Sequence, residues 1–218
     1  MPAPRRSEMD SYTPMHHTVL TLKTGGQVPA HGNRISELVG IEMINHRRTG
    51  NRLHYTFKPE PTCAPSACKP HEHDPFAQQF DQRAEEIVAL VDGTTLVVHN
   101  APAVLAALNA ELKRLERPPI ESHAKRVIDT RALAEQAYPA QNNSFTALCE
   151  RLGLDRTPHS YPDTRREAVL LCHLYERLRT DHIAQNLQAR LNAPTTPNPM
   201  NDFASWMACV TSWLPEDA

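Results

Sequence analysis

Strand-like segments come first in this chain and then alternate with helix-like segments, and this order restricts the fold more than any other feature. Residues 18–22, 35–44 and 53–57 contain β-branched or alternating apolar residues, which is typical of strands. Residues 45–51 separate the last two segments and end in turn residues, so a hairpin is predicted there. Residues 96–98 have the continuous apolar character of a buried strand.

Apolar residues at helical spacing surround the buried strand. Residues 80–90 are predicted to form a helix that ends at Asp92-Gly93. Asn100 is expected to cap a second helix, because an Asn at this position can accept a hydrogen bond from the first turn and Pro102 follows it.

The last third of the predicted domain continues the alternation. Residues 127–129 form a short strand, residues 130–137 a helix, Ser144 caps a helix that runs through Leu152, and residues 165–178 form a strongly periodic helix. Three strands followed by alternating helices and strands imply an α/β fold with a mixed central sheet flanked by helices.

Charge and cysteine content exclude several classes of protein. The chain has 25 acidic and 23 basic residues and a net charge of -2, so a nucleic-acid ligand would need a local basic patch. No apolar run approaches the ~18 residues of a membrane span, and the start lacks the apolar stretch of a secretory signal. Five scattered cysteines indicate a reducing compartment, so we expect a cytoplasmic protein without a membrane partner.

The chain is predicted to have three parts. Residues 1–17 form a flexible tail, residues 18–183 a folded domain, and residues 184–218 a proline-rich tether followed by an amphipathic helix. One face of that helix carries Phe203, Trp206, Met207, Val210 and Trp213. Such a face binds a groove of a partner protein, or it folds back on its own domain.

A loop rich in prolines also contains a possible metal site. Cys63, Cys68, His71 and His73 are four zinc-type ligands within eleven residues. Their spacing differs from that of a standard zinc finger, and a loop without metal is the alternative.

Five segments of the domain carry a resemblance to a known family. They are Asn33–Gly40, Asn45–Asn51, Leu96–Ala101, Val127–Ala134 and Asn143–Cys149, in this order. Over roughly residues 18–183 the chain resembles the epsilon proofreading subunits of bacterial DNA polymerase III, within the DEDD 3'-5' exonuclease superfamily. The resemblance implies a ribonuclease-H-like exonuclease fold.

The resemblance also implies a chemistry, which is phosphodiester hydrolysis by two divalent cations, Mg2+ or Mn2+. Such hard cations need oxygen ligands. In the family these come from an Asp-x-Glu pair on the first strand, an Asp after His-Asn, and a late Asp five residues after a general-base His.

This sequence departs from the family pattern at nearly every catalytic position. The first-strand pair falls on Thr21 and Lys23, the next Asp on Val104, and the last Asp on Glu167. One carboxylate of four remains in this degenerate pocket. Like charges ~4 Å apart repel by about 4 kcal/mol near a protein surface, so Lys23 opposes a bound metal.

The general base is displaced as well. Its position falls on Pro162, and His159 is offset by three residues. We therefore expect hydrolysis to be lost or very weak, with no required cofactor.

An active exonuclease with a rearranged site is the alternative. Its acids would be Glu37, Glu42, Asp129 and Asp163. However, Asp129 follows a strand and precedes a helix, where an acid commonly caps the helix. Glu37 is expected on a sheet edge that faces solvent.

Several residues are candidates for contacts with nucleic acid. They are His99 and Asn100 from the family motif, Arg47 and Arg48 in the hairpin, and Arg165 and Arg166 beside the degenerate pocket. Ordinary solvated surface charge is the alternative for the arginines.

Together these patterns predict a protein with an exonuclease fold that acts by binding. Its expected partners are a single-stranded nucleic acid and a DNA polymerase subunit, the latter through the C-terminal helix. The third hypothesis is that the chain is a family member whose fold now serves an unrelated interaction.

Overall fold

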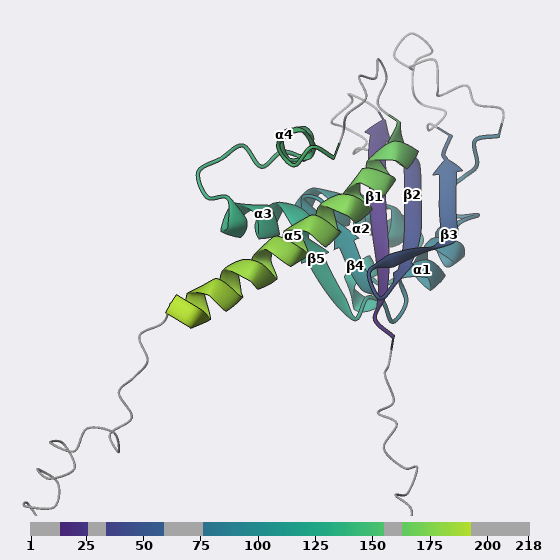
Figure 1. Ribbon diagram of the computed structural model, residues 1–218. Coiled ribbons are helices and arrows are strands. Elements are labelled where there is room, and N and C mark those ends of the chain that lie inside the picture. The colour runs from purple at the N-terminus through teal and green to yellow at the C-terminus, as the bar shows by residue number, and fades with distance from the viewer. Residues whose placement is uncertain (1–13, 26–33, 59–75, 155–162, 193–218) are drawn as a thin grey trace, which may run out of the picture. The chain divides into compact units, whose positions relative to one another are not determined.

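A five-stranded mixed sheet forms the centre of the computed structural model, which describes residues 14–25, 34–58, 76–154 and 163–192 (Figure 1). Its strands are β1 (His16–Gly25), β2 (Arg34–Ile44), β3 (Arg47–Thr56), β4 (Thr95–Val98) and β5 (Arg126–Asp129), in the order β3-β2-β1-β4-β5. The first three strands pair antiparallel, whereas β4 is parallel to β1 and β5. The predicted mixed sheet is confirmed.

Five α-helices accompany the strands in the described ranges. They are α1 (Ala84–Val91), α2 (Ala101–Arg114), α3 (Thr130–Ala137), α4 (Phe145–Arg151) and α5 (Thr164–Asn192), with a short 3-10 turn at Ile120–Ser122. The chain divides into one unit of residues 1–181 and a second of residues 182–218, to which the last part of α5 belongs. No described helix is long and apolar enough to cross a membrane.

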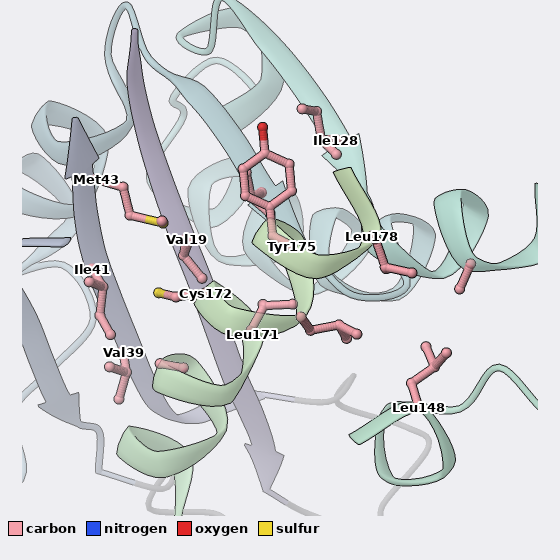
Figure 2. Packing of buried hydrophobic residues seen from close by; sticks show 14 residues of the cluster. Val19, Val39, Ile41, Met43, Ile128, Leu148, Leu171, Cys172, Tyr175 and Leu178 are labelled. Atoms are coloured by element: carbon pink, nitrogen blue, oxygen red, sulfur yellow. The ribbon is translucent and has the colours of Figure 1, made fainter. Parts of the chain in front are cut away.

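Each face of the sheet is covered by a separate hydrophobic cluster, because neighbouring strand residues point to opposite faces. Val19, Val39, Ile41 and Met43 pack with the buried face of α5, as Figure 2 shows. The α5 residues in this cluster are Ala168, Leu171, Cys172, Leu174, Tyr175 and Leu178. The opposite face, which includes Leu20, Leu38 and Leu96, packs with residues of α1 and α2.

The predicted hairpin forms, but its turn is shorter than expected. Asn45 and His46 alone make the turn, with φ of 51° and 64°. Two successive positive φ angles produce a tight turn whose twist matches that of the strands. Arg47 and Arg48 therefore lie in β3 rather than in a loop, and Gly50, with φ of 97°, lies where the β2–β3 register shifts.

Three predicted boundaries also differ from the structure. The strand β1 begins at His16, inside the segment 1–17 that was expected to be a tail. The helix predicted over residues 80–90 begins at Ala84. The helix α5 continues to Asn192 and so includes residues 184–192 of the predicted tether, because that stretch has no proline or glycine to end it.

A buried carboxylate joins α2 to the start of β2. Glu111 is 2% exposed and accepts hydrogen bonds from Arg34 Nε at 2.7 Å and from the backbone N–H of Ile35 at 3.2 Å. Its second oxygen lies 3.2 Å from a guanidinium nitrogen of Arg114. Removal of one partner from such a group leaves buried charges and donors unpaired, which costs more than the pair contributes.

We expect Glu111→Ala to lower the free energy of unfolding by about 1–3 kcal/mol, because the buried Ile35 N–H loses its acceptor. Urea denaturation followed by circular dichroism measures the change. The matched control is Glu150→Ala on the exposed face of α4, which should change stability by about 0.5 kcal/mol or less. Equal stability of the two variants would contradict the structural role of Glu111.

Candidate functional site

The carboxyl ends of three parallel strands meet at one edge of the sheet. Since β1, β4 and β5 run in the same direction, Lys23, His99 and Asp129 all come at or just after the ends of their strands. The amino end of α5 lies at the same edge, because the Thr21 hydroxyl donates a hydrogen bond to the Thr164 carbonyl at 3.3 Å. Open α/β sheets bind their ligands at this edge, so it is the candidate site.

Glu37 is the centre of the polar contacts at this edge. Its Oε2 lies 3.5 Å from Lys23 Nζ and accepts a hydrogen bond from the Thr164 hydroxyl. Its Oε1 lies 2.9 Å from His54 Nε2. Both oxygens of Glu37 are thus already bound by groups from β1, β3 and α5.

The surroundings of Glu37 stabilise its charged form. Burial alone would raise the pKa of Glu37, but hydrogen bonds from Thr164 and His54 and the charge of Lys23 together lower it. The expectation of a solvent-facing sheet edge was wrong, because β2 is an internal strand and the side chain is 21% exposed. We name this cluster of Lys23, Glu37, His54 and Thr164 the Glu37 network.

Glu167, the one acid retained at a family position, is half-buried on the first turns of α5. Its pKa is raised by burial, and the nearby carboxylates of Glu37 and Asp163 raise it further, while Lys23 acts in the opposite direction. Asp163 itself accepts a hydrogen bond from the Arg165 N–H at 2.9 Å at the start of α5. Near the amino end of α5 the edge therefore holds three carboxylates, and two of them, Glu37 and Asp163, already accept hydrogen bonds from protein groups.

Asp129 links the amino ends of two helices. Its Oδ1 accepts hydrogen bonds from the backbone N–H groups of Asn100 and Arg131, and its Oδ2 accepts one from Ala101, all at 2.9 Å. The interpretation of Asp129 as a capping acid is confirmed. The expected capping of α2 by the Asn100 side chain was wrong, since Asn100 adopts a left-handed conformation (φ 64°) and makes no such bond.

His99 is held in place by neighbouring elements. Its Nδ1 lies 3.0 Å from the Thr130 hydroxyl, and its ring contacts Phe145 edge-on with centroids 5.4 Å apart. Burial lowers the pKa of His99, which keeps the imidazole neutral near pH 7.

Val104 contributes an apolar contact rather than a ligand. It lies on α2 and packs against the cluster that contains Leu20 and Leu38. Thr21 and Lys23 alternate with Leu20 along β1 and so project from the other face of the strand. The structure thus joins Thr21, Lys23 and Glu167 near the amino end of α5, while Val104 belongs to the packing of α2.

The candidate arginines occupy two opposite ends of the molecule. Arg165 is exposed beside Asp163, and Arg166 follows it in the first turn of α5. Arg47 and Arg48 are exposed at the start of β3, where Arg48 pairs with Met43. Glu37 and Met43 are six residues apart on β2, so the two ends are separated by about 20 Å.

The acids of the rearranged alternative do not converge. Glu42 lies close to the hairpin turn, where it accepts a hydrogen bond from the Thr49 hydroxyl at 2.7 Å. Asp129 caps helices. Within the ranges that the structure describes, no group of three or more His, Cys, Asp or Glu residues is arranged to hold a metal ion. The residues at this edge do not fit a two-metal centre.

Several predicted residues lie outside the described ranges. They are the possible zinc ligands Cys63, Cys68, His71 and His73, the displaced base His159, and the helix face of Phe203, Trp206, Met207, Val210 and Trp213. These predictions stay predictions.

Sequence reasoning missed two members of the Glu37 network, His54 and Thr164. For His54 a signal existed: the hairpin register pairs it with Val39, so it shares a sheet face with Glu37. For Thr164, which lies far along the chain, no local pattern marked the contact.

The chain is similar to known proteins in sequence and in fold. The family model RNase T, described as "Exonuclease", matches residues 23–170. The chain belongs to this exonuclease family. The predicted membership of an exonuclease family is thereby confirmed.

Relatives of this chain include several proteins named DNA polymerase III subunit epsilon. The one from Pasteurella multocida is 34% identical over 170 residues, which are 74% of this chain and 67% of the relative. The one from Escherichia coli is 32% identical over 167 residues, or 72% and 68% of the two chains. The one from Rickettsia prowazekii is 31% identical over 201 residues, or 90% and 85%.

Solved structures confirm the predicted ribonuclease-H-like fold. The nuclease domain of 3'hExo, a DEDDh family member bound to rAMP, matches with a TM-score of 0.60 and 16% identity. The match covers 79% of this chain and 94% of that domain. The complex of E. coli ExoI with single-stranded DNA also matches with a TM-score of 0.60, at 14% identity, over 77% of this chain and 41% of ExoI.

We expect the double variant Thr21→Asp, Lys23→Glu to respond to Mn2+, unlike the wild type. Without metal its melting temperature should fall, because two more carboxylates then face Glu37 and Glu167. Added Mn2+ should restore it, since a ligand that binds only the folded state stabilises by about 2.7 kcal/mol at 100 times its Kd.

The matched control is Lys23→Gln, which removes the cation without adding an acid. Differential scanning fluorimetry should show no Mn2+ response for this variant or for the wild type. A wild-type response as large as that of the double variant would contradict our account of the site.

Proposed function

We propose that this exonuclease-family chain binds a nucleic-acid strand without hydrolysing it and acts in the cytoplasm as a structural or regulatory subunit of a replication or repair complex. The observation that carries this proposal is the Glu37 network. Lys23 occupies a family carboxylate position, and its ammonium group lies 3.5 Å from Glu37. A protein cation and a neighbouring acid thus occupy the edge where the family resemblance implies metal ligands.

The energetics of metal binding support the loss of hydrolysis. A divalent cation must exchange part of its hydration shell for protein oxygens, and here the family positions offer a threonine, a lysine and one glutamate. Glu37 would have to give up its contacts with Lys23, His54 and Thr164 before it could serve as a ligand. The loss of each of these contacts would further reduce the affinity of the site for a divalent cation.

Binding of a strand does not depend on metal ligands. Arg165 is exposed at the amino end of α5 and suits a phosphate contact at the pocket. The likeness to the ExoI complex with single-stranded DNA and to the 3'hExo domain bound to rAMP supports a nucleic-acid ligand for this fold.

One observation favours the alternative of an active exonuclease with a rearranged site. The carboxylates of Glu37 and Asp163 lie close enough to Glu167 to raise its pKa. This version of the alternative keeps Glu37 and Asp163 and uses Glu167 in place of Glu42 and Asp129. Because the described residues are not arranged to hold a metal ion, Lys23 and the three carboxylates would have to move before a Mg2+ or Mn2+ ion could bind. The hydrogen bonds that Glu37 and Asp163 already make weigh against it.

The names of the relatives also support a polymerase partner. The matched region spans about two thirds of the Pasteurella and E. coli epsilon subunits. We propose that residues 195–218, with the apolar face of Phe203, Trp206, Met207, Val210 and Trp213, attach the chain to a DNA polymerase subunit.

We expect the wild type to leave labelled single-stranded DNA intact in both Mg2+ and Mn2+, because the family positions offer too few oxygen ligands. A denaturing gel with E. coli ExoI as the positive control makes the measurement. Metal-dependent degradation by the wild type that disappears in Glu167→Ala would establish the alternative instead.

We expect a chain that ends at residue 194 to lose binding to the purified replicative polymerase subunit of the source organism, because it lacks the five apolar anchors. Surface plasmon resonance with the full chain as reference gives the affinity. Unchanged affinity of the truncated chain would show that the attachment lies elsewhere.

A further inference from the structure

A single row of residues crosses all five strands at the hairpin end of the sheet. Strand register places Arg48, Met43, His17, Thr95 and Arg126 side by side, from β3 to β5. Neighbouring strands are about 4.8 Å apart, so the two arginines of this row are separated by about 19 Å. Both arginines are exposed, one on each edge strand of the sheet.

Helix α5 adds aromatic and cationic groups over the middle of this row. The Tyr175 hydroxyl lies 3.1 Å from His17 Nε2, and the His46 ring lies 4.7 Å from the His17 ring and 5.9 Å from the Tyr175 ring. Arg179 follows Tyr175 by one turn of α5 and lies close enough to act on both histidines.

The local charge is positive. Burial lowers the pKa of His17, and His46, Arg179 and Arg126 lower it further, with no carboxylate among its charged neighbours. In the described part of the chain, His17 Nδ1, both ring nitrogens of His46 and Arg179 Nε make no hydrogen bond. The carboxylate of Glu176 acts at the flank of this group, near Cys172 and Arg48.

Another arginine continues the positive charge along the exposed edge strand. Arg52 pairs with Ile41 and projects from the same sheet face as Arg48, whereas Arg47 projects from the opposite face. Arginine is well suited to phosphate because its planar fork donates two parallel hydrogen bonds to one phosphate group. His17 and Tyr175 are buried, so the arginines are the groups on this face that a strand can reach.

We propose that Arg48, Arg126 and Arg179 form a second nucleic-acid surface, which contacts the phosphate backbone of a single strand. We name it the hairpin-end surface. Its span of about 19 Å is too long for one phosphate group and fits an extended polyanion. The surface goes beyond the proposed function, because it lies about 20 Å along the strands from the Glu37 network and uses none of its residues.

The test measures binding of a fluorescein-labelled oligothymidylate by anisotropy at several salt concentrations. The triple variant Arg48→Gln, Arg126→Gln, Arg179→Gln should bind about tenfold more weakly at low salt. Its salt slope should fall by about 2, since each lost contact with a single strand removes about 0.7.

The matched control removes three positive charges that have carboxylate partners elsewhere on the molecule. It is Arg83→Gln, Arg117→Gln, Arg177→Gln, whose partners are Glu86, Glu85 and Asp181. This control should bind within about twofold of the wild type, because its charges are locally neutralised. Equal losses in the two triple variants would overturn the proposal, since net charge alone would then explain binding.

A third arm separates this surface from the pocket. If Arg165→Gln abolishes binding and the hairpin-end variant does not, the second surface is wrong and pocket binding stands. If the wild type binds no oligonucleotide, both the surface and the nucleic-acid part of the proposed function are wrong. If the wild type degrades the DNA but its binding still depends on the hairpin-end arginines, the surface stands and the non-hydrolytic function is wrong.

A competition experiment tests whether the ligand is a nucleic acid. If polyglutamate displaces the labelled oligonucleotide as strongly as unlabelled oligothymidylate does, the choice of nucleic acid as ligand is overturned.

Discussion

The packing of α5 across the sheet is the interaction on which both ends of the molecule depend. Leu171, Cys172 and Leu178 are fully buried against strand residues such as Val19 and Val97. Burial of one such aliphatic side chain contributes about 2 kcal/mol, so the helix is fixed in direction and register. As a result its first turn supplies Thr164 and Glu167 to the carboxyl edge of β1, and later turns supply Tyr175 and Arg179 to the opposite end.

This arrangement explains how the edge keeps its shape with a threonine and a lysine at two positions where the family resemblance implies acids. Metal-free carboxylates repel one another, so an emptied site would tend to open. Here Lys23 supplies a permanent positive charge, and Thr164 and His54 supply hydrogen bonds to Glu37. The resulting network ties β1, β2, β3 and α5 together through protein groups alone.

Local patterns predicted most elements, since strand alternation and helical spacing follow directly from burial on one face. They failed where a backbone conformation or a distant partner decides the outcome. The left-handed Asn100 leaves the capping of α2 to Asp129, which lies 29 residues away. The Thr164–Glu37 contact joins positions 127 residues apart. Such contacts depend on the packing of α5, which no single segment encodes.

The two ends of the sheet differ less in their number of charged side chains than in how many of those side chains already have hydrogen-bond or ion-pair partners. The net charge of -2 describes a nearly neutral chain. At the carboxyl edge, two of the acids already have protein partners. Asp129 accepts three backbone hydrogen bonds, and both carboxylate oxygens of Glu37 contact protein groups. At the hairpin end, the charged groups that act on His17 are all cationic. In the proposed hairpin-end surface a polyanion would meet arginines that outnumber the nearby carboxylates of Glu42 and Glu176.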